Sequence, residues 1–428
     1  MKPILYLLLV SISLVGDTLN ELVDYAMANA PVVKQTQAEI TRAALQHQQS
    51  KAAQYGTLEL VADYTHYNTE RTLAPLSPNA IGSGTPITTT KDLVSAGVRY
   101  GVPLFTGFSQ TRRIEIAALG NELEHAKGHL SREQIVYNIR ALYLSILSLQ
   151  ELYFAQQHYS QALEQLKKQI AYEVELGKKA SLDLLKVRAD LYASQTQEAR
   201  FQADMDIAKA TLSAMVGKEV NGLEALEIDV SPPDYDIDRL YATSARLSKV
   251  ALEQIKVRQA EKKEAQTRSS QFPQLSFNAY YGKNYGEDIQ RSQWDHETLW
   301  QAGIHAQYTL WDFGLKSMQT QAAAVATLKA SLHKEQTLLD LKKLVAHAVA
   351  KVNRSYTVYL GMQAQMQLTQ ESERIERVRY ENGVATLNDL LLAKGKYHIA
   401  KAKVIESKYS YQRDIYYIDY VMEQGAPQ

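Results

Sequence analysis

The ten prolines of this 428-residue chain leave two long stretches without proline. Prolines occur at positions 3, 31, 75, 78, 86, 103, 232, 233, 273 and 427, so none lies between residues 104 and 231 or between 274 and 426. Proline breaks a helix interior because it lacks an N–H and clashes with the preceding turn. The first stretch, and the second from about Gly314 onward, are rich in Ala, Leu, Gln, Glu, Lys and Arg, which favour helices. We therefore expect long helices at 107–176 and 314–381.

Apolar residues in these stretches recur every three or four positions, which is typical of amphipathic, coiled-coil-like helices. A helix of roughly 70 residues would be on the order of 100 Å long, too long to fit inside a compact globule. The stripes consist of Ile135, Ile139, Leu142, Ile146 and Leu149, then Leu163, Leu166, Ile170 and Val174, and finally Leu338, Leu341, Val345, Ala348 and Val352.

The two halves of the chain repeat each other. Leu104 and Leu310, Gly177 and Gly383, and Asp183 and Asp389 form three pairs of landmarks, and the members of each pair are 206 residues apart. Such regular spacing indicates an internal duplication. We expect repeats at 17–220 and 239–424, joined by a linker at 221–238. Each repeat would run helix, strand, strand, long helix, helix, with tip turns at 177–181 and 382–387.

Segments before each long helix alternate between apolar and polar residues, as strands with two different faces do. We expect strands at 57–68, 92–106, 273–285 and 299–312. About eleven residues suffice for a tilted strand to cross the hydrocarbon layer of a membrane. The polar face would line a lumen, and its charged or ionisable members are Glu59, Asp63, Arg99 and His305. Aromatic rings mark lipid–water interfaces, where we expect Phe105, Trp300, Trp311 and Phe313.

Four strands cannot close into a cylinder. Eight would close around an interior filled by side chains, whereas twelve leave room for a lumen. A barrel with a lumen built from this chain therefore requires several copies, and three is the simplest number.

The beginning of the chain and its composition narrow the class of protein further. Lys2 precedes an apolar run from Ile4 to Val15, which predicts a signal peptide at 1–16. The 47 basic and 47 acidic residues cancel, which argues against nucleic acid as a partner. No cysteine and no catalytic motif occur, so we expect neither an enzyme nor a cofactor. His125 and His129 are spaced for a shared metal, but no third ligand is evident and we expect no metal site.

At this point the sequence resembles the TolC-like outer membrane efflux protein family, the outer membrane factors of tripartite efflux and secretion systems. The resemblance covers nearly the whole mature chain. It rests on Asn29-Ala30-Pro31, on Val102-Pro103-Leu104-Phe105-Thr106-Gly107 with its counterpart at 308–314, and on the two tip segments at 175–185 and 380–391.

The resemblance implies a mostly α fold with a β-barrel part. Three chains would form a 12-stranded transmembrane β-barrel in the cell outer membrane, continued by a long periplasmic α-helical barrel. It also implies a passive conduit for small toxic compounds or polypeptides, as in tripartite efflux or type I secretion. Its partners would be the homotrimer itself, a periplasmic adaptor (membrane fusion) protein, an inner membrane RND, ABC or MFS pump, and outer membrane lipid.

By the same resemblance the two tips would form a periplasmic gate from Asp389, its repeat mate Asp183, and Tyr380. The residues implied for adaptor docking are Gly177, Lys178, Gly383 and Val384. The chain departs from the family pattern at Ala385 and Leu392, where some members carry a gate arginine and a second acidic ring. Thr386 and Asp389 also fit a helix capping box, and the glycines fit helix C-caps, so the gate assignment has a purely structural alternative.

The alternative to an outer membrane channel is a secreted coiled-coil structural or adhesion protein, in which the strand hairpins would be water-soluble elbows.

Overall fold

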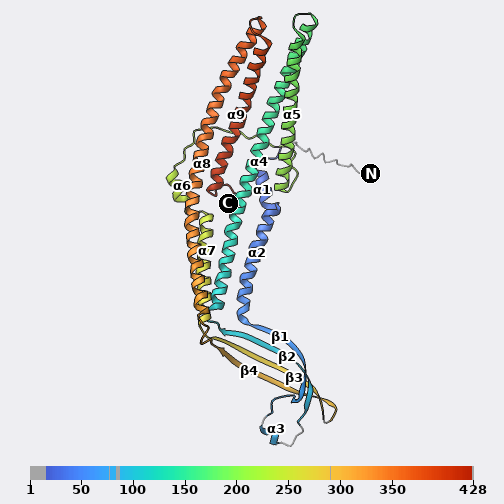
Figure 1. The fold of residues 1–428 in the computed structure, drawn as a ribbon, viewed down its shortest axis with the longest axis vertical. Helices are drawn as coiled ribbons and strands as arrows, with labels where there is room; N and C mark the ends of the chain where they lie inside the picture. Colours follow the sequence, from blue (N-terminus) through green and yellow to red (C-terminus); the bar gives the residue numbers. More distant parts are fainter. Residues whose placement is uncertain (1–15, 77, 83–86, 290, 427–428) are drawn as a thin grey trace, which may run out of the picture. The chain divides into compact units, whose positions relative to one another are not determined.

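A computed structural model of the chain describes residues 16–76, 78–82, 87–289 and 291–426. The expected signal peptide at 1–16 lies outside these residues, except for Gly16. The elements, shown in Figure 1, are α1 (Leu19–Asn29), α2 (Pro31–Ala52), η1 (Ala53–Tyr55), β1 (Thr57–Thr72), α3 (Pro78–Gly82), β2 (Thr89–Phe105), α4 (Ser109–Glu175), α5 (Ser181–Val216), α6 (Ile237–Ser244), α7 (Ser248–Arg268), η2 (Ser269–Gln271), β3 (Gln274–Asp288), β4 (Gln293–Gln307), α8 (Leu315–Glu381) and α9 (Leu387–Val421).

The described residues are mostly helical with one small antiparallel sheet, and the order of elements is the same in both halves except for α3, which lies between β1 and β2 and has no described counterpart between β3 and β4. Helices α4 and α8 each contain 67 residues, which corresponds to about 100 Å at 1.5 Å per residue. None of the described helices is both long enough and apolar enough to span a lipid bilayer.

The described chain divides into two compact units, and each unit draws on both sequence halves. The hairpin unit comprises the residues up to Ala38, Ala126–Ala251 and Gln336 onward; the sheet unit comprises Glu39–His125 and Leu252–Glu335. The long helices α4 and α8 contribute residues to both units, which is why the units do not coincide with the sequence halves.

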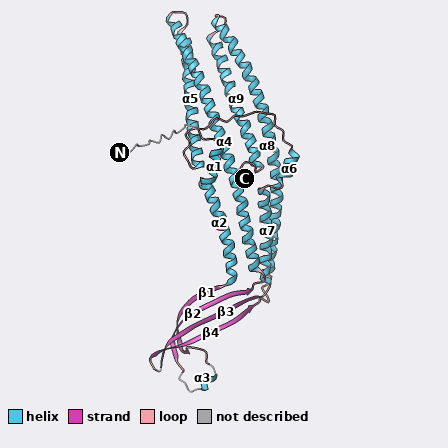
Figure 2. Cartoon of the chain, turned by 180° about the vertical axis from the view of Figure 1, so that it is seen from behind, coloured by secondary structure: helices cyan, strands magenta, loops and turns pink. Residues whose placement is uncertain are grey.

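In the sheet unit the four strands lie in the order β1-β2-β3-β4, with every neighbouring pair antiparallel (Figure 2). The last pair of the β3–β4 ladder is Gln274 with Gln307, so β4 ends at Gln307, whereas alternation in the sequence continues to about residue 312. Pro273 precedes Gln274, and proline has no N–H with which to continue the ladder. The structure also starts β4 at Gln293, six residues before the expected beginning.

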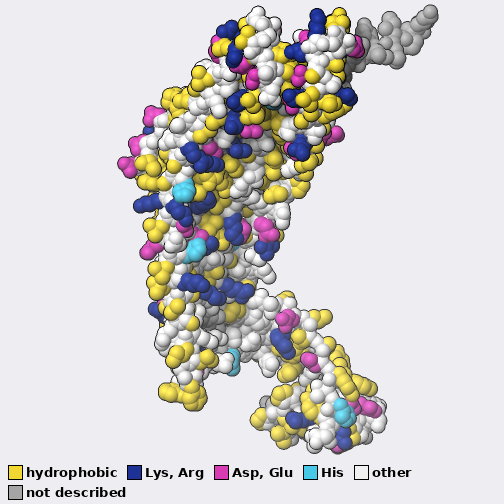
Figure 3. All heavy atoms as spheres, turned by 45° about the horizontal axis from the view of Figure 1, so that its top comes forward, with side chains coloured by type: hydrophobic (Ala, Val, Ile, Leu, Met, Phe, Trp, Pro, Cys, Tyr) yellow, Lys and Arg dark blue, Asp and Glu magenta, His cyan; other side chains and the backbone are white. Residues whose placement is uncertain are grey.

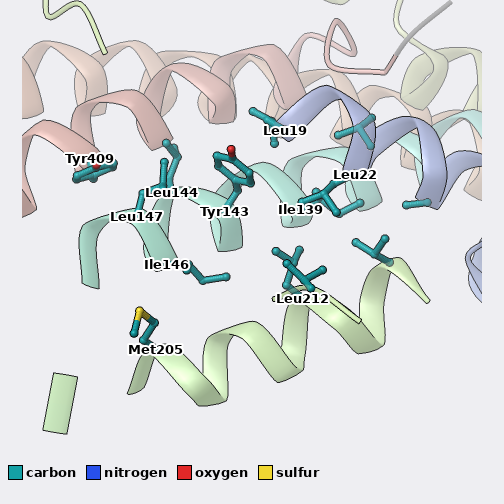
Figure 4. Packing of buried hydrophobic residues seen from close by; sticks show 14 of the residues in the cluster. Leu19, Leu22, Ile139, Tyr143, Leu144, Ile146, Leu147, Met205, Leu212 and Tyr409 are labelled. Atoms are coloured by element: carbon teal, nitrogen blue, oxygen red, sulfur yellow. The ribbon is translucent and has the colours of Figure 1, made fainter. Parts of the chain in front are cut away.

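The main core of the hairpin unit joins α1, α4, α5 and α9 (Figure 4). Leu22, Ile139 and Leu212 are fully buried there, and Ile139 belongs to the apolar stripe that the sequence predicts for the first long helix. The Tyr143 hydroxyl donates a hydrogen bond of 2.6 Å to the Glu224 carbonyl oxygen, which fixes the segment after α5 against α4. A second cluster, nearer the helical tips, contains Leu163, Leu166, Ile170, Val187, Leu191, Tyr380, Leu387, Leu390 and Leu391.

Candidate functional site: two sheet faces and two hairpin tips

One face of the sheet is apolar across all four strands. Leu60 of β1 lies opposite Val98 of β2. Val98 lies opposite Tyr281 of β3, which in turn lies opposite Trp300 of β4. The exposed fractions of these four side chains range from 40% at Val98 to 86% at Leu60. A contiguous apolar surface of this kind marks a site of contact with a membrane or another protein.

The other face of the sheet is polar and carries all four predicted lumen residues. Glu59 of β1 lies opposite Arg99 of β2, and Asp63 follows on the same face because side chains alternate along a strand. His305 of β4 lies opposite Ser276, and the register places this pair on the same face as Arg99. The four side chains are exposed to solvent in the single chain.

Three of the four predicted interface aromatics lie where strands meet helices. Phe105 contacts Phe108 edge-on with ring centroids 5.5 Å apart, and Trp311 contacts Phe313 in the same manner at 6.1 Å. Trp300 differs, because it lies in the middle of β4 and not near an end of the strand. The association of these rings with membrane interfaces remains a prediction.

The first tip, between α4 and α5, is closed by a Schellman motif. Gly177 has φ +70°, and its N–H donates to the Val174 carbonyl oxygen at 2.9 Å. The Lys178 N–H donates to the Glu173 carbonyl oxygen at 2.8 Å, which satisfies a second carbonyl at the helix end. The N-cap of α5 is Ala180, which supplies no side-chain cap.

The second tip, between α8 and α9, has the same backbone turn but a different cap. Gly383 has φ +74°, and the Val384 N–H donates to the Arg379 carbonyl oxygen at 2.8 Å. The Thr386 N–H and hydroxyl both donate to Asp389 Oδ2, at 3.0 and 2.7 Å, and the Asp389 N–H donates to Thr386 Oγ1 at 3.2 Å. The capping box that the sequence allows is therefore present.

Hydrogen bonds from the Thr386 side chain and backbone lower the pKa of the Asp389 carboxyl, so this group stays ionised at neutral pH. Its repeat mate Asp183 also lies in the first turn of its helix, where its N–H donates to the Ala180 carbonyl oxygen at 3.0 Å. A gate role for either carboxylate needs neighbouring copies of the chain and stays a prediction.

Tyr380, the third predicted gate residue, lies mostly inside the second cluster, with 9% of its surface exposed. The Lys179 ammonium of the first tip lies 4.7 Å from the centroid of its ring. Burial raises the pKa of the Tyr380 hydroxyl, although Lys179 opposes this. Tyr380 thus connects the two hairpins within one chain. Figure 3 shows basic and acidic side chains side by side around both tips.

A buried polar layer between the hairpins was missed by the sequence reasoning. His398 Nε2 hydrogen-bonds Gln156 Oε1 at 2.6 Å, and Gln156 Nε2 donates to Ser194 Oγ at 2.7 Å. One signal could have revealed it: Gln156 continues the three-and-four spacing between the stripes that contain Leu149 and Leu163, so it is a polar residue at a helix-seam position.

No cluster of three or more potential metal ligands occurs among the described residues. His129 lies 3.8 Å from Glu423 and 3.3 Å from the Ser248 hydroxyl.

The sequence matches the family model described as outer membrane efflux protein over residues 22–218 and 241–415. The chain belongs to the outer membrane efflux protein family. This confirms the resemblance and makes the chain a component of an outer membrane efflux channel of tripartite systems, not an enzyme, with its helical part in the periplasm.

Solved structures show the same fold at low sequence identity. A membrane protein from Pseudomonas aeruginosa aligns with a TM-score of 0.80 at 16% identity, covering 95% of this chain and 91% of that one. The outer membrane protein VceC from Vibrio cholerae gives 0.76 at 15% identity, covering 94% and 95%. The CmeC outer membrane channel of Campylobacter jejuni gives 0.76 at 15%, covering 96% and 86%. A comparison with curated protein sequences found no match.

Proposed function

We propose that three copies of this chain assemble into a passive export channel. Their sheets would close a twelve-stranded barrel in the outer membrane, and their helices would continue it as a helical barrel through the periplasm. The mature chain would begin after residue 16, with repeats at 17–220 and 239–424 around the linker at 221–238.

The observation that carries this proposal is the two-faced sheet. Its apolar face is exposed across four strands, and its polar face collects Glu59, Asp63, Arg99 and His305. Lipid would cover the first face and water the second, which avoids placing charge against acyl chains.

The sheet edges support the number of copies. In the described part of the chain, β1 and β4 are the outer strands of the sheet and pair on one side only. Backbone N–H and C=O groups in lipid require partners, so β1 of one copy would pair with β4 of the next. Twelve strands are the smallest multiple of four above eight, and they leave a lumen.

We also propose that the hairpin tips form the periplasmic mouth. Asp389, Asp183 and Tyr380 would narrow it, with Gly177, Lys178, Gly383 and Val384 docking a periplasmic adaptor. Three copies of an ionised carboxylate around a narrow axis attract cations. An inner membrane pump of the RND, ABC or MFS class would supply the energy, and the cargo would be small toxic compounds or polypeptides.

Cysteine cross-linking between sheet edges tests the closed barrel, because the chain has no cysteine of its own. Ala62 on β1 and Ala302 on β4 lie on the apolar face, on opposite edges of the sheet. In outer membranes, Ala62→Cys combined with Ala302→Cys should yield covalent dimers and trimers with a thiol reagent spanning about two strand spacings of 4.8 Å.

The matched control is Ala279→Cys combined with Ala302→Cys. These two residues lie directly opposite each other on β3 and β4 of one chain, so they should cross-link within the monomer only. If the edge pair also gave only monomers while the control pair reacted, neighbouring copies would not pair through β1 and β4, and the barrel would be rejected.

A further inference from the structure

The hairpin unit contains a groove of about 490 Å³ between α4, α8 and α9. Residues from all three helices line it, among them Tyr159, Glu373, Arg374, Lys394, His398 and Lys401. The size is in the range of small-molecule sites, which combine an apolar or aromatic surface with a few polar groups. Helices α8 and α9 form one hairpin and α4 belongs to the other, so a molecule in this groove would touch both.

The floor of the groove is a pair of stacked rings. Tyr159 and His398 have ring centroids 4.3 Å apart and planes within 7° of parallel. A planar ligand can extend such a stack, because offset-stacked rings attract one another.

Hydrogen bonds beneath the floor fix its orientation. Gln156 is 4% exposed, and its Nε2 donates to the Ser194 carbonyl oxygen at 3.1 Å and to Ser194 Oγ at 2.7 Å. Its Oε1 is therefore the acceptor toward His398 Nε2, 2.6 Å away, so that this nitrogen carries the ring proton. The imidazole is held as one tautomer and cannot rotate without breaking the buried layer.

The walls of the groove carry an excess of positive charge. Glu373, 7% exposed, contacts Lys394 at 3.1 Å and Arg377 at 3.4 Å. Arg374 pairs with Glu371 at 2.6 Å, and this exposed pair is open to competition from another anion.

Lys401 makes no ion pair with any described carboxylate, which leaves its charge uncompensated within the groove. Burial and the nearby Lys401 charge lower the pKa of His398 to about 4, so its ring is neutral at physiological pH. The positive potential over the floor therefore comes from the lysine and arginine side chains.

We propose that this groove binds an organic anion with a planar aromatic body, which stacks on the Tyr159–His398 floor while its carboxylate or sulfonate pairs with Lys401 and Arg374. A small inorganic anion would leave the floor unused, and an aromatic cation would be repelled by the walls. The site does not depend on the proposed export function. Because its ligand contacts both hairpins, binding stabilises this arrangement of the two by mass action.

The test is calorimetric titration of the full chain in lipid nanodiscs with naphthalene-2-sulfonate, with empty nanodiscs subtracted. Naphthalene-2-methanol serves as the neutral probe and naphthalene-2-methylammonium as the cationic one. The sulfonate should bind most tightly, and its Kd should rise with salt concentration. Lys401→Gln and Arg374→Gln should each raise that Kd roughly threefold or more, in line with partly exposed charge pairs.

Lys403→Gln is the matched control, because Lys403 lies on the same helix, is exposed and does not line the groove. It should leave the Kd unchanged. The proposal is overturned if no saturable heat is seen, if the neutral probe binds as tightly as the sulfonate, or if both groove variants bind like the unmodified protein. Circular dichroism checks the fold of each variant. If Lys401→Gln does not fold, the Kd of Arg374→Gln alone decides the outcome.

Discussion

Gly107 and Gly314 offer a matched test of what shapes the junction between strands and long helices. Each lies just before a long helix and has a positive φ, +63° and +88°, which an L-residue adopts at a cost of about 1–2 kcal/mol. Their surroundings differ. A Cβ added to Gly107 would lie 2.4 Å from the Ser269 carbonyl oxygen and 2.8 Å from the Phe272 Cβ, whereas one added to Gly314 would have no described atom within 4 Å.

Gly107→Ala should therefore be much more damaging than Gly314→Ala. Gly314→Ala should cost only the free energy of placing an L-residue at positive φ, about 1–2 kcal/mol. Gly107→Ala adds an overlap with backbone, and overpacking of this kind costs about 1–3 kcal/mol more. The difference corresponds to roughly a 5- to 150-fold change in the folding equilibrium.

Guanidinium denaturation followed by tryptophan fluorescence measures this difference, because all three tryptophans lie in or next to β4. The midpoint should fall further for Gly107→Ala than for Gly314→Ala, with similar slopes for both. Equal midpoints, or a lower one for Gly314→Ala, would refute the reasoning, since backbone conformation alone would then set the cost or another chain would contact Gly314.

Three further predictions address the mouth, the core and the buried histidine. Asp389→Asn keeps an acceptor for Thr386 but removes the charge, so it should weaken cation selectivity in planar bilayers. The control Thr386→Ala costs about 1 kcal/mol of helix capping but should leave the selectivity unchanged. An unchanged reversal potential in Asp389→Asn would show that this residue does not line the mouth. Leu212→Ala should cost about 2–5 kcal/mol because Leu212 is fully buried, and a urea midpoint shift no larger than that of the 59% exposed Leu185→Ala would contradict this. The pKa of His398 is about 4 in the folded chain, below its ordinary value of 6.5. Between these two pH values the unfolded chain binds a proton that the folded chain does not, so stability present above pH 6.5 should be lost as pH falls toward 4. The loss should be on the order of 1 kcal/mol after solvent screening, and melting curves should show a weaker pH dependence in His398→Gln; an equal dependence would rule His398 out.

Local patterns in the sequence were enough to predict most of the secondary structure. The stripe residues Ile139, Leu163 and Val345 are buried because a 3.6-residue period places them on one helical face. Strand alternation likewise identified two faces, since successive side chains point to opposite sides of a sheet. Both signals are carried by neighbours in sequence, which is why one sequence sufficed.

Features that depend on distant residues could not be read in the same way. The end of β4 depends on Pro273. This proline directly precedes β3, the strand that pairs with β4, and is not a neighbour of β4 in the sequence. The contact of Lys179 with Tyr380 and the layer of Gln156, Ser194 and His398 join helices far apart in the chain. Gln156 has one local signal, its seam position in the three-and-four spacing of α4, but that spacing does not indicate that Ser194 and His398 are its partners.

The two tips have the same backbone turn but differ in the side chains that cap the following helix. Gly177 and Gly383 make the same left-handed turn, because a Schellman motif needs only a residue that tolerates positive φ. Beyond the turn, Thr386 engages the Asp389 carboxylate, whereas Ala180 has no side chain with which to engage Asp183. The Asp389 carboxylate is thus oriented toward its own helix start, with one oxygen already accepting two hydrogen bonds. The Asp183 carboxylate has no such restraint from its cap, so of the two repeat mates it is the one that can reorient toward a cation or a partner at lower cost.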